Sequence, residues 1–143
     1  MDRKRPADDA AAPGLPGLTR LHHIAIIAAN LDASLDFYVR VLGFRIRTRN
    51  FRAARQSWKV DLRHPSGIAI ELFTFPDAPA RPTRPEALGL RHLAFAVADL
   101  EAATRHLIAA GVAVEDIRTD PGTGARFTFF SDPDGLPWEL YQV

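Results

Sequence analysis

The chain has 143 residues, of which 47% are hydrophobic and 24% charged, and its formal net charge is +1 at pH 7. These values are typical of one globular domain, and the near-neutral charge argues against nucleic-acid binding through bulk electrostatics. The absence of cysteine excludes a thiol nucleophile, iron–sulfur clusters and disulfides. No apolar run approaches the length of a membrane span, so we expect a cytoplasmic protein with no nucleic-acid or membrane partner.

The N-terminal residues 1–17 predict a disordered tail. They combine a short basic cluster with three prolines and contain no long apolar stretch, which argues against a signal peptide. The remaining residues, 18–143, are expected to form a single domain.

An internal repeat organises this domain. Residues 21–33 and 90–102 align at an offset of 69, with six of 13 pairs identical. We therefore expect two repeats, at about 21–75 and 90–143.

Each repeat continues into a predicted helix. Asn30 and Asp99 stand where an N-cap belongs, and Gly43 and Gly111 stand where each helix should end.

After each helix the hydrophobic period changes to two, which predicts strands. Each repeat then has the order βαβββ, so the fold class is α+β, with two tandem βαβββ repeats forming a curved mixed sheet. On the first of these strands Arg45, Arg47 and Arg49 should share one face, either as a solvated surface or near an anionic substrate. Besides the first strand of each repeat, the predicted strands are 44–49, 57–62 and 68–75, then 112–117, 125–130 and 136–142.

Between the repeats, residues 74–88 carry a proline at every third position from Pro76 to Pro85. This spacing is typical of a polyproline II segment, which predicts a stiff linker. A ligand for a proline-recognising module is the alternative.

Four polar residues occupy duplicated positions. His23 and Glu71 lie in the first and last strands of one repeat, and His92 and Glu139 lie in the same places of the other. Strand alternation places them on faces lined largely by alanine, opposite the bulky apolar side chains.

A carboxylate within an apolar strand is costly to bury unless it is paired or coordinated. One divalent cation would neutralise two converging carboxylates, and imidazole with carboxylate suits Zn²⁺, Ni²⁺ or Co²⁺, with Fe²⁺ or Mn²⁺ as alternatives. We therefore predict one divalent metal ion held by His23, Glu71, His92 and Glu139.

The chain also resembles the vicinal-oxygen-chelate superfamily of glyoxalases, bleomycin resistance proteins and dioxygenases. The resemblance covers nearly all of residues 20–143 and is greatest to glyoxalase-I-like metalloproteins of the YaeR-like branch. It is carried by His22-His23-Ile24-Ala25-Ile26, Phe37-Tyr38-Val39-Arg40-Val41-Leu42-Gly43-Phe44, Ile70-Glu71-Leu72, Arg91-His92-Leu93-Ala94-Phe95 and Asp132-Pro133-Asp134-Gly135-Leu136-Pro137-Trp138-Glu139-Leu140.

The resemblance implies the same four metal ligands and a lactoylglutathione-lyase-like activity on a small carbonyl compound or thiol adduct. Glu139, or Glu71 by pseudo-symmetry, would move a carbon-bound proton. Ile27 and Phe75 replace an arginine and an asparagine of glyoxalase I, which argues against a glutathione hemithioacetal as the substrate. The residues expected to bind substrate are Trp58, Phe73, Phe75 and Arg126.

Two alternatives stay open on the same fold: a module that binds a drug or antibiotic, and a metal-dependent dioxygenase. The resemblance further implies a homodimer, with the metal site either within one chain or shared across the dimer.

Overall fold

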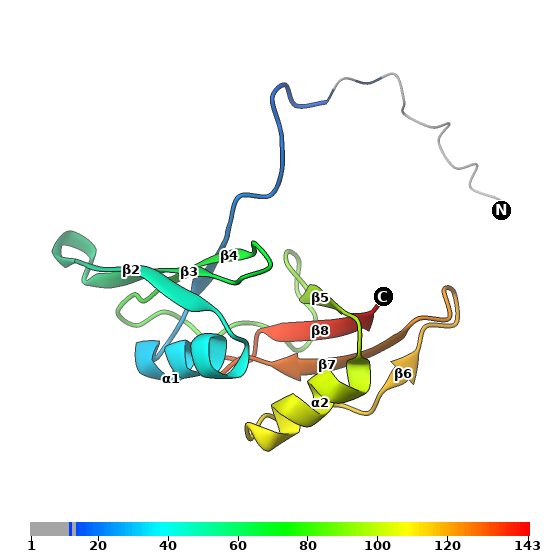
Figure 1. The fold of residues 1–143 in the computed structure, drawn as a ribbon. Helices are drawn as coiled ribbons and strands as arrows, with labels where there is room; N and C mark the ends of the chain where they lie inside the picture. The colour runs from blue at the N-terminus through cyan, green and yellow to red at the C-terminus, as the bar shows by residue number, and fades with distance from the viewer. Residues whose placement is uncertain (1–11, 13) are drawn as a thin grey trace.

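The computed structural model describes residue 12 and residues 14–143, so most of the expected disordered tail lies outside the described residues. Residues 14–23, before β1, extend away from the two sheets (Figure 1). No helix within the described part of the chain is long and apolar enough to cross a membrane. The elements, in chain order, are β1 (Ile24–Ile27), α1 (Leu31–Leu35), η1 (Asp36–Val41), β2 (Arg45–Arg52), η2 (Ala53–Arg55), β3 (Ser57–Arg63), β4 (Ala69–Phe73), β5 (Leu93–Val97), α2 (Leu100–Ala109), β6 (Arg118–Thr119), β7 (Arg126–Ser131) and β8 (Pro137–Gln142).

The predicted fold class is confirmed, because both halves have the order βαβββ. The strands form two mixed sheets, with the order β1-β4-β3-β2 in sheet A and β5-β8-β7-β6 in sheet B. In each sheet the first strand pairs in parallel with the last, and the other pairs are antiparallel. No strand pairing joins the two sheets within the described residues, so β1 and β5 are both edge strands.

The predicted helix ends are confirmed. The side chains of Asn30 and Asp99 accept hydrogen bonds from the backbone N–H groups of Ala33 and Ala102, as N-caps do. Gly43 and Gly111 follow the helices with φ of 85° and 86°, a region that glycine enters without strain. The first helix widens along its length, because α1 continues into the π-helical segment η1.

Two strand predictions are wrong in detail. Residues 112–117 are not a strand: Glu115 bonds to Phe129 through the backbone, but a regular ladder begins only at Arg118. A bulge in β2 pairs Ile46 with Leu62 and Thr48 with Asp61, and this irregularity breaks the expected alternation. The arginines of β2 therefore do not form one continuous face.

One hydrophobic core connects the two halves. It contains apolar side chains from both sheets and both helices, including Leu72 of sheet A and Leu140 of sheet B. At its centre, the Tyr38 hydroxyl donates to Asp132 at 2.8 Å and accepts from Trp138 Nε1 at 3.2 Å. Burial raises the pKa of Tyr38, and the charge of Asp132 adds to this effect. This buried network fixes the first helix against the turn before β8.

Candidate functional site

The two histidine–glutamate pairs each form at the junction of a first strand and a last strand. In sheet A, Ala25 lies beside Glu71 in register, and His23 precedes β1 on the same face. Its Nε2 lies 2.6 Å from Glu71 Oε2. In sheet B, Ala94 lies beside Glu139, and His92 Nε2 lies 3.4 Å from Glu139 Oε2. The sequence repeat thus produces the same arrangement twice.

Both pairs lie on the open face of their sheet. The bulky Ile26 is buried, whereas Ala25 and Ala94 on the opposite face are exposed. The carboxylates are the more protected members, with 15% of the Glu71 side chain and 13% of the Glu139 side chain exposed. Each pair is therefore sheltered yet reachable from solvent.

The residue before each histidine contacts the other side of its imidazole ring. His22 Nδ1 lies 2.9 Å from His23 Nδ1, and Arg91 Nη1 lies 2.9 Å from His92 Nδ1. In both pairs Nε2 consequently faces the carboxylate. A guanidinium can only donate, so His92 Nδ1 accepts from Arg91 and the proton of the neutral ring lies on Nε2, toward Glu139. His92 Nε2 would therefore bind a cation only after Arg91 releases Nδ1, since a histidine ligand donates its other ring N–H.

The structure brings the four residues together as two pairs and not as one set of four. Among residue 12 and residues 14–143, no three histidine, cysteine, aspartate or glutamate side chains gather closely enough to hold a metal ion. Neighbouring donors on one zinc-like ion lie about 3.0–3.4 Å apart, given bond lengths near 2.1 Å. The His92–Glu139 distance of 3.4 Å falls in this range, whereas the His23–Glu71 distance of 2.6 Å is that of a hydrogen bond, so these two atoms would have to separate to share an ion.

Beside Glu71 stands a cation. Lys59 Nζ lies 2.9 Å from Glu71 Oε1 and 3.7 Å from Asp61 Oδ1. The hydrogen bond to Glu71 and the charge of Asp61 raise the pKa of Lys59 above its ordinary value. Lys59 is the only lysine among the described residues. Because it occupies Oε1, only Oε2 of Glu71 faces His23.

Beside Glu139 stand aromatic rings instead. Phe129 pairs with Glu139 across β7 and β8, and its ring meets the His92 ring edge-on at 5.0 Å. Phe127, two residues earlier, occupies the position that Lys59 has in sheet A. The guanidinium of Arg118 lies over the Phe127 and Phe129 rings, at 5.1 and 5.7 Å from their centroids. The two pairs are therefore chemically unequal despite the repeat.

The residues predicted to bind substrate divide between the two faces. Phe73 follows Glu71 on the same face, and its ring stacks with Phe75 at 6.1 Å. Trp58 lies on the opposite face, where it packs against the core and contacts Phe51. Arg126 is also on the opposite face of its strand and pairs with Glu101 of α2 at 2.5 Å. Of these four residues, only Phe73 thus lies on the face of a histidine–glutamate pair, and Phe75 stacks on it.

Sequence reasoning missed three residues near the pairs: Lys59, Arg118 and Phe129. Strand alternation carries the signal for Lys59 and Phe129, because each has the parity that places it on the open face once the strand pairing is known. Arg118 had no such signal, since it lies in a two-residue strand within a segment whose register the sequence did not show.

Comparisons with known proteins agree with this architecture. The sequence profile of the Glyoxalase/Bleomycin resistance protein/Dioxygenase superfamily matches residues 20–140. The uncharacterized protein YaeR of Escherichia coli (strain K12) is 56% identical over 126 residues, covering 88% of this chain and 98% of YaeR. YwkD of Bacillus subtilis (strain 168), also uncharacterized, is 54% identical over 87% of this chain and 98% of its own.

The same agreement holds in three dimensions. A glyoxalase family protein from Enterococcus faecalis superposes with a TM-score of 0.81 at 46% identity, covering 85% of this chain and 96% of that one. The superfamily contains both enzymes and binding proteins, and metal dependence is common in it. The chain belongs to the glyoxalase/bleomycin resistance protein/dioxygenase superfamily.

Proposed function

We propose that this protein is a metal-dependent lyase or isomerase of the glyoxalase type that acts on a small carbonyl compound. One divalent ion, of the Zn²⁺, Ni²⁺ or Co²⁺ kind, would be held by His23, Glu71, His92 and Glu139. The observation that carries the proposal is the duplicated histidine–glutamate pair on the open face of each sheet. Two imidazoles and two carboxylates match the charge and the donor preference of such an ion.

We further propose that the four ligands meet when two copies of the chain associate. The separation of the pairs within one chain supports this arrangement, as does the free edge of both β1 and β5. Ile27 on β1 has 54% of its surface exposed, and Leu90 just before β5 has 53%. A two-fold dimer would join sheet A of each copy to sheet B of the other and so form two identical sites.

The chemistry follows from the inequality of the two carboxylates. A divalent ion, when bound, supplies Lewis-acid polarisation of a carbonyl oxygen. Glu71 is held by Lys59 and His23 at its two oxygens, which suits a fixed ligand. Glu139 has no lysine or arginine within 4 Å among the described residues and lies against Phe129. Glu139 is therefore the carboxylate that takes the carbon-bound proton, in a setting lined by phenyl rings.

Metal content per chain tests the proposal. The protein is stripped with a chelator, reloaded separately with Zn²⁺, Ni²⁺, Co²⁺, Fe²⁺ and Mn²⁺, and assayed by elemental analysis. We expect about one ion per chain for at least one metal, and loss of that ion in both His23→Ala and His92→Ala. His64→Gln is the matched control, because His64 bonds to Ser66 in the turn between β3 and β4.

Each outcome has a definite meaning. Metal retained in both histidine variants would refute the ligand assignment. A wild-type protein that takes up no ion would refute the enzyme proposal and favour a metal-free binding module on the same fold.

A further inference from the structure

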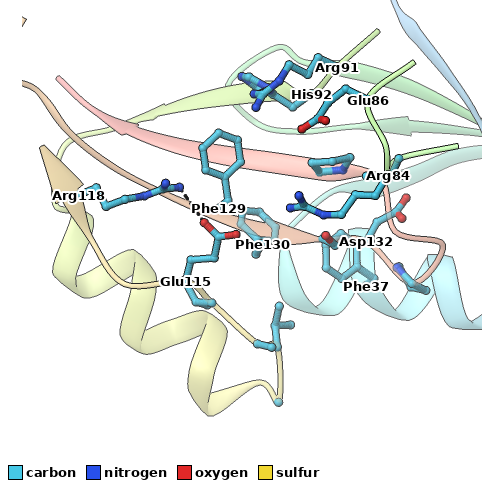
Figure 2. Close-up of a pocket in the computed structure, with 18 residues that line it drawn as sticks. Phe37, Arg84, Glu86, Arg91, His92, Glu115, Arg118, Phe129, Phe130 and Asp132 are labelled. Atoms are coloured by element: carbon cyan, nitrogen blue, oxygen red, sulfur yellow. Dashed lines mark hydrogen bonds and ion pairs between the residues drawn. The ribbon is translucent and has the colours of Figure 1, made fainter. Parts of the chain in front are cut away.

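A cleft of about 760 Å³ opens beside His92 (Figure 2). It is bounded by the linker between the two halves, by the irregular segment 111–118 and by β7. Apolar side chains form much of its wall, including Phe129, Phe130 and Val114. The four-ligand set does not account for this cleft, because of the four residues only His92 is among those that line it.

Arg118 is fixed at one side of the cleft. Its guanidinium lies over Phe127 and Phe129, and its Nη2 donates to Glu115 at 2.8 Å. The negative faces of the two rings attract the guanidinium and help to hold it in place. The remaining N–H groups of the planar fork are then free to donate to another acceptor, an arrangement well suited to carboxylate or phosphate.

Arg84 approaches the cleft from the linker, and Figure 2 shows its side chain pointing inward. Within the part of the chain that the structure describes, no carboxylate lies within 4 Å of its guanidinium. A third arginine, Arg91, lines the same cleft and donates to His92.

Three carboxylates also line the cleft, as many as its arginines, but they do not pair with Arg84 or Arg91. Glu115 is paired with Arg118, and Asp132 is buried and accepts from Tyr38 and from backbone N–H groups. Among the described residues, Glu86 is then the one carboxylate lining the cleft that has no cation or N–H partner. Among the same residues, two arginines that line the cleft, Arg84 and Arg91, have no carboxylate partner. As far as the structure describes the chain, the cleft consequently presents two guanidinium groups without a carboxylate partner beside an aromatic wall.

We propose that this cleft binds a small organic anion, with its carboxylate or phosphate group at Arg84 and Arg118 and its carbon skeleton against Phe129. The binding of the anion does not depend on a metal. Its role rests on the proposed function: a ligand in this position lies beside His92, so the substrate would be a carbonyl compound that carries an anionic group.

Binding to the metal-free protein tests the proposal. The probes are phenyl phosphate, benzoate and benzamide, which share one ring and carry a phosphate, a carboxylate and a neutral amide. Their affinities are measured by titration followed in two-dimensional amide NMR spectra. We expect the two anions to shift the amide signals of residues 112–118 and 129–132, and the neutral probe to bind at least about tenfold more weakly, the effect of losing a charge-assisted hydrogen bond. The stronger of the two anions identifies the preferred group.

Matched variants locate the site. Arg84→Gln and Arg118→Gln should each weaken anion binding about tenfold or more. Arg105→Gln, which removes the same charge from the exposed face of α2 outside the cleft, should leave it unchanged. Added NaCl should weaken binding of the anions but not of benzamide, and this readout uses only the wild-type protein.

Equal affinity for benzamide and the anions, wild-type affinity in both cleft variants, or no binding of any probe would each overturn the proposal. The metal assay is independent of this result. If the protein binds the anions but takes up no metal, the anion-site proposal stands and the proposed enzyme function is refuted. If it takes up metal but binds none of the anions, only the anion-site proposal is refuted.

Discussion

At the scale of single residues, the inequality of Glu71 and Glu139 has the greatest consequence for function. The sequence repeat makes the two carboxylates look equivalent, and either one is a reasonable proton acceptor on that basis. Lys59 at the first and Phe127 at the second remove the equivalence, because an oxygen already bound to an ammonium is less free to take a proton. This contrast predicts that Glu139→Gln slows proton transfer more than Glu71→Gln does.

Glu139→Gln should preserve the fold and part of the metal affinity, since a glutamine oxygen still binds a cation weakly. It should slow the exchange of carbon-bound protons of a small α-hydroxyketone with solvent by about 10²- to 10⁴-fold, the usual contribution of a general base. Exchange is followed by NMR in D₂O with the metal-loaded protein. Glu101→Gln on α2 is the control, and undiminished exchange in Glu139→Gln would exclude this residue as the base.

Asp132 provides a second prediction, on stability. Burial raises the pKa of Asp132 above its ordinary 3.8, although N–H and O–H donors from Leu136, Tyr38 and Asp134 oppose the shift. A raised pKa in the folded state means that the folded protein binds the proton more tightly than the unfolded chain does. The contribution of this group to stability is therefore complete below pH 3.8 and is lost as the pH rises through the raised pKa.

Asp132→Asn removes that titration and keeps an oxygen that accepts hydrogen bonds. The unfolding free energy of the wild type minus that of the variant should fall as the pH rises from 3.8 and then become constant. Urea denaturation at a series of pH values measures the difference. A difference that grows with pH would show that ionised Asp132 is favoured by the fold.

At the scale of secondary-structure elements, the two helices begin and end where their capping residues and glycines predict. Both N-caps and both terminal glycines are where the sequence places them. The strands were less predictable, because pairing with a neighbour decides where a strand begins and where a bulge interrupts it. Segment 112–117 has strand-like alternation, with Val112 and Val114 packed on the core, yet lacks a continuous ladder.

Asp99→Ala should therefore destabilise the protein by about 1 kcal/mol, because it leaves an N–H group at the start of α2 without its side-chain acceptor. Asp99→Ser retains a capping oxygen and should lose much less. Urea denaturation of the two variants gives the comparison, and equal losses would show that the cap contributes nothing to the stability of α2.

At the scale of the whole molecule, the two halves pack through their helix-side surfaces and leave the histidine–glutamate pairs apart. Phe37 contacts Phe130, and Tyr38 contacts Trp138, so the first helix is shared between the halves. Because the core joins the halves in this way, sheet A and sheet B of one chain do not combine their open faces. The proposed dimer is the arrangement that restores a four-ligand set.

Mixing two inactive variants tests this arrangement directly. His23→Ala has a defective sheet A, and His92→Ala has a defective sheet B. If the site is shared, a mixed dimer contains one site with all four ligands, and equimolar mixing after subunit exchange should restore about a quarter of the wild-type metal content, since half of the dimers are mixed and each holds one of two sites.

The control is a double variant carrying both substitutions in one chain, mixed with itself, which should restore none. Metal content that stays at the level of the separate variants after proven exchange would place all four ligands within one chain.

The sequence by itself determined the repeat, the order of elements, the helix ends and the face on which each histidine and glutamate lies. These features depend on local patterns, namely capping residues, the strand period of two and the comparison of one half with the other. They singled out His23, Glu71, His92 and Glu139, but as one set of four ligands and not as two pairs.

Only the tertiary structure decided how the pairs are placed and what surrounds them. It placed Arg126 against Glu101 and Trp58 against the core. It also placed Lys59 at the carboxylate of Glu71, and Arg118 over the ring of Phe129 beside the other pair. The reason is physical: periodicity shows which side of an element is apolar, whereas the contact between two halves depends on the shapes of buried side chains from distant parts of the chain.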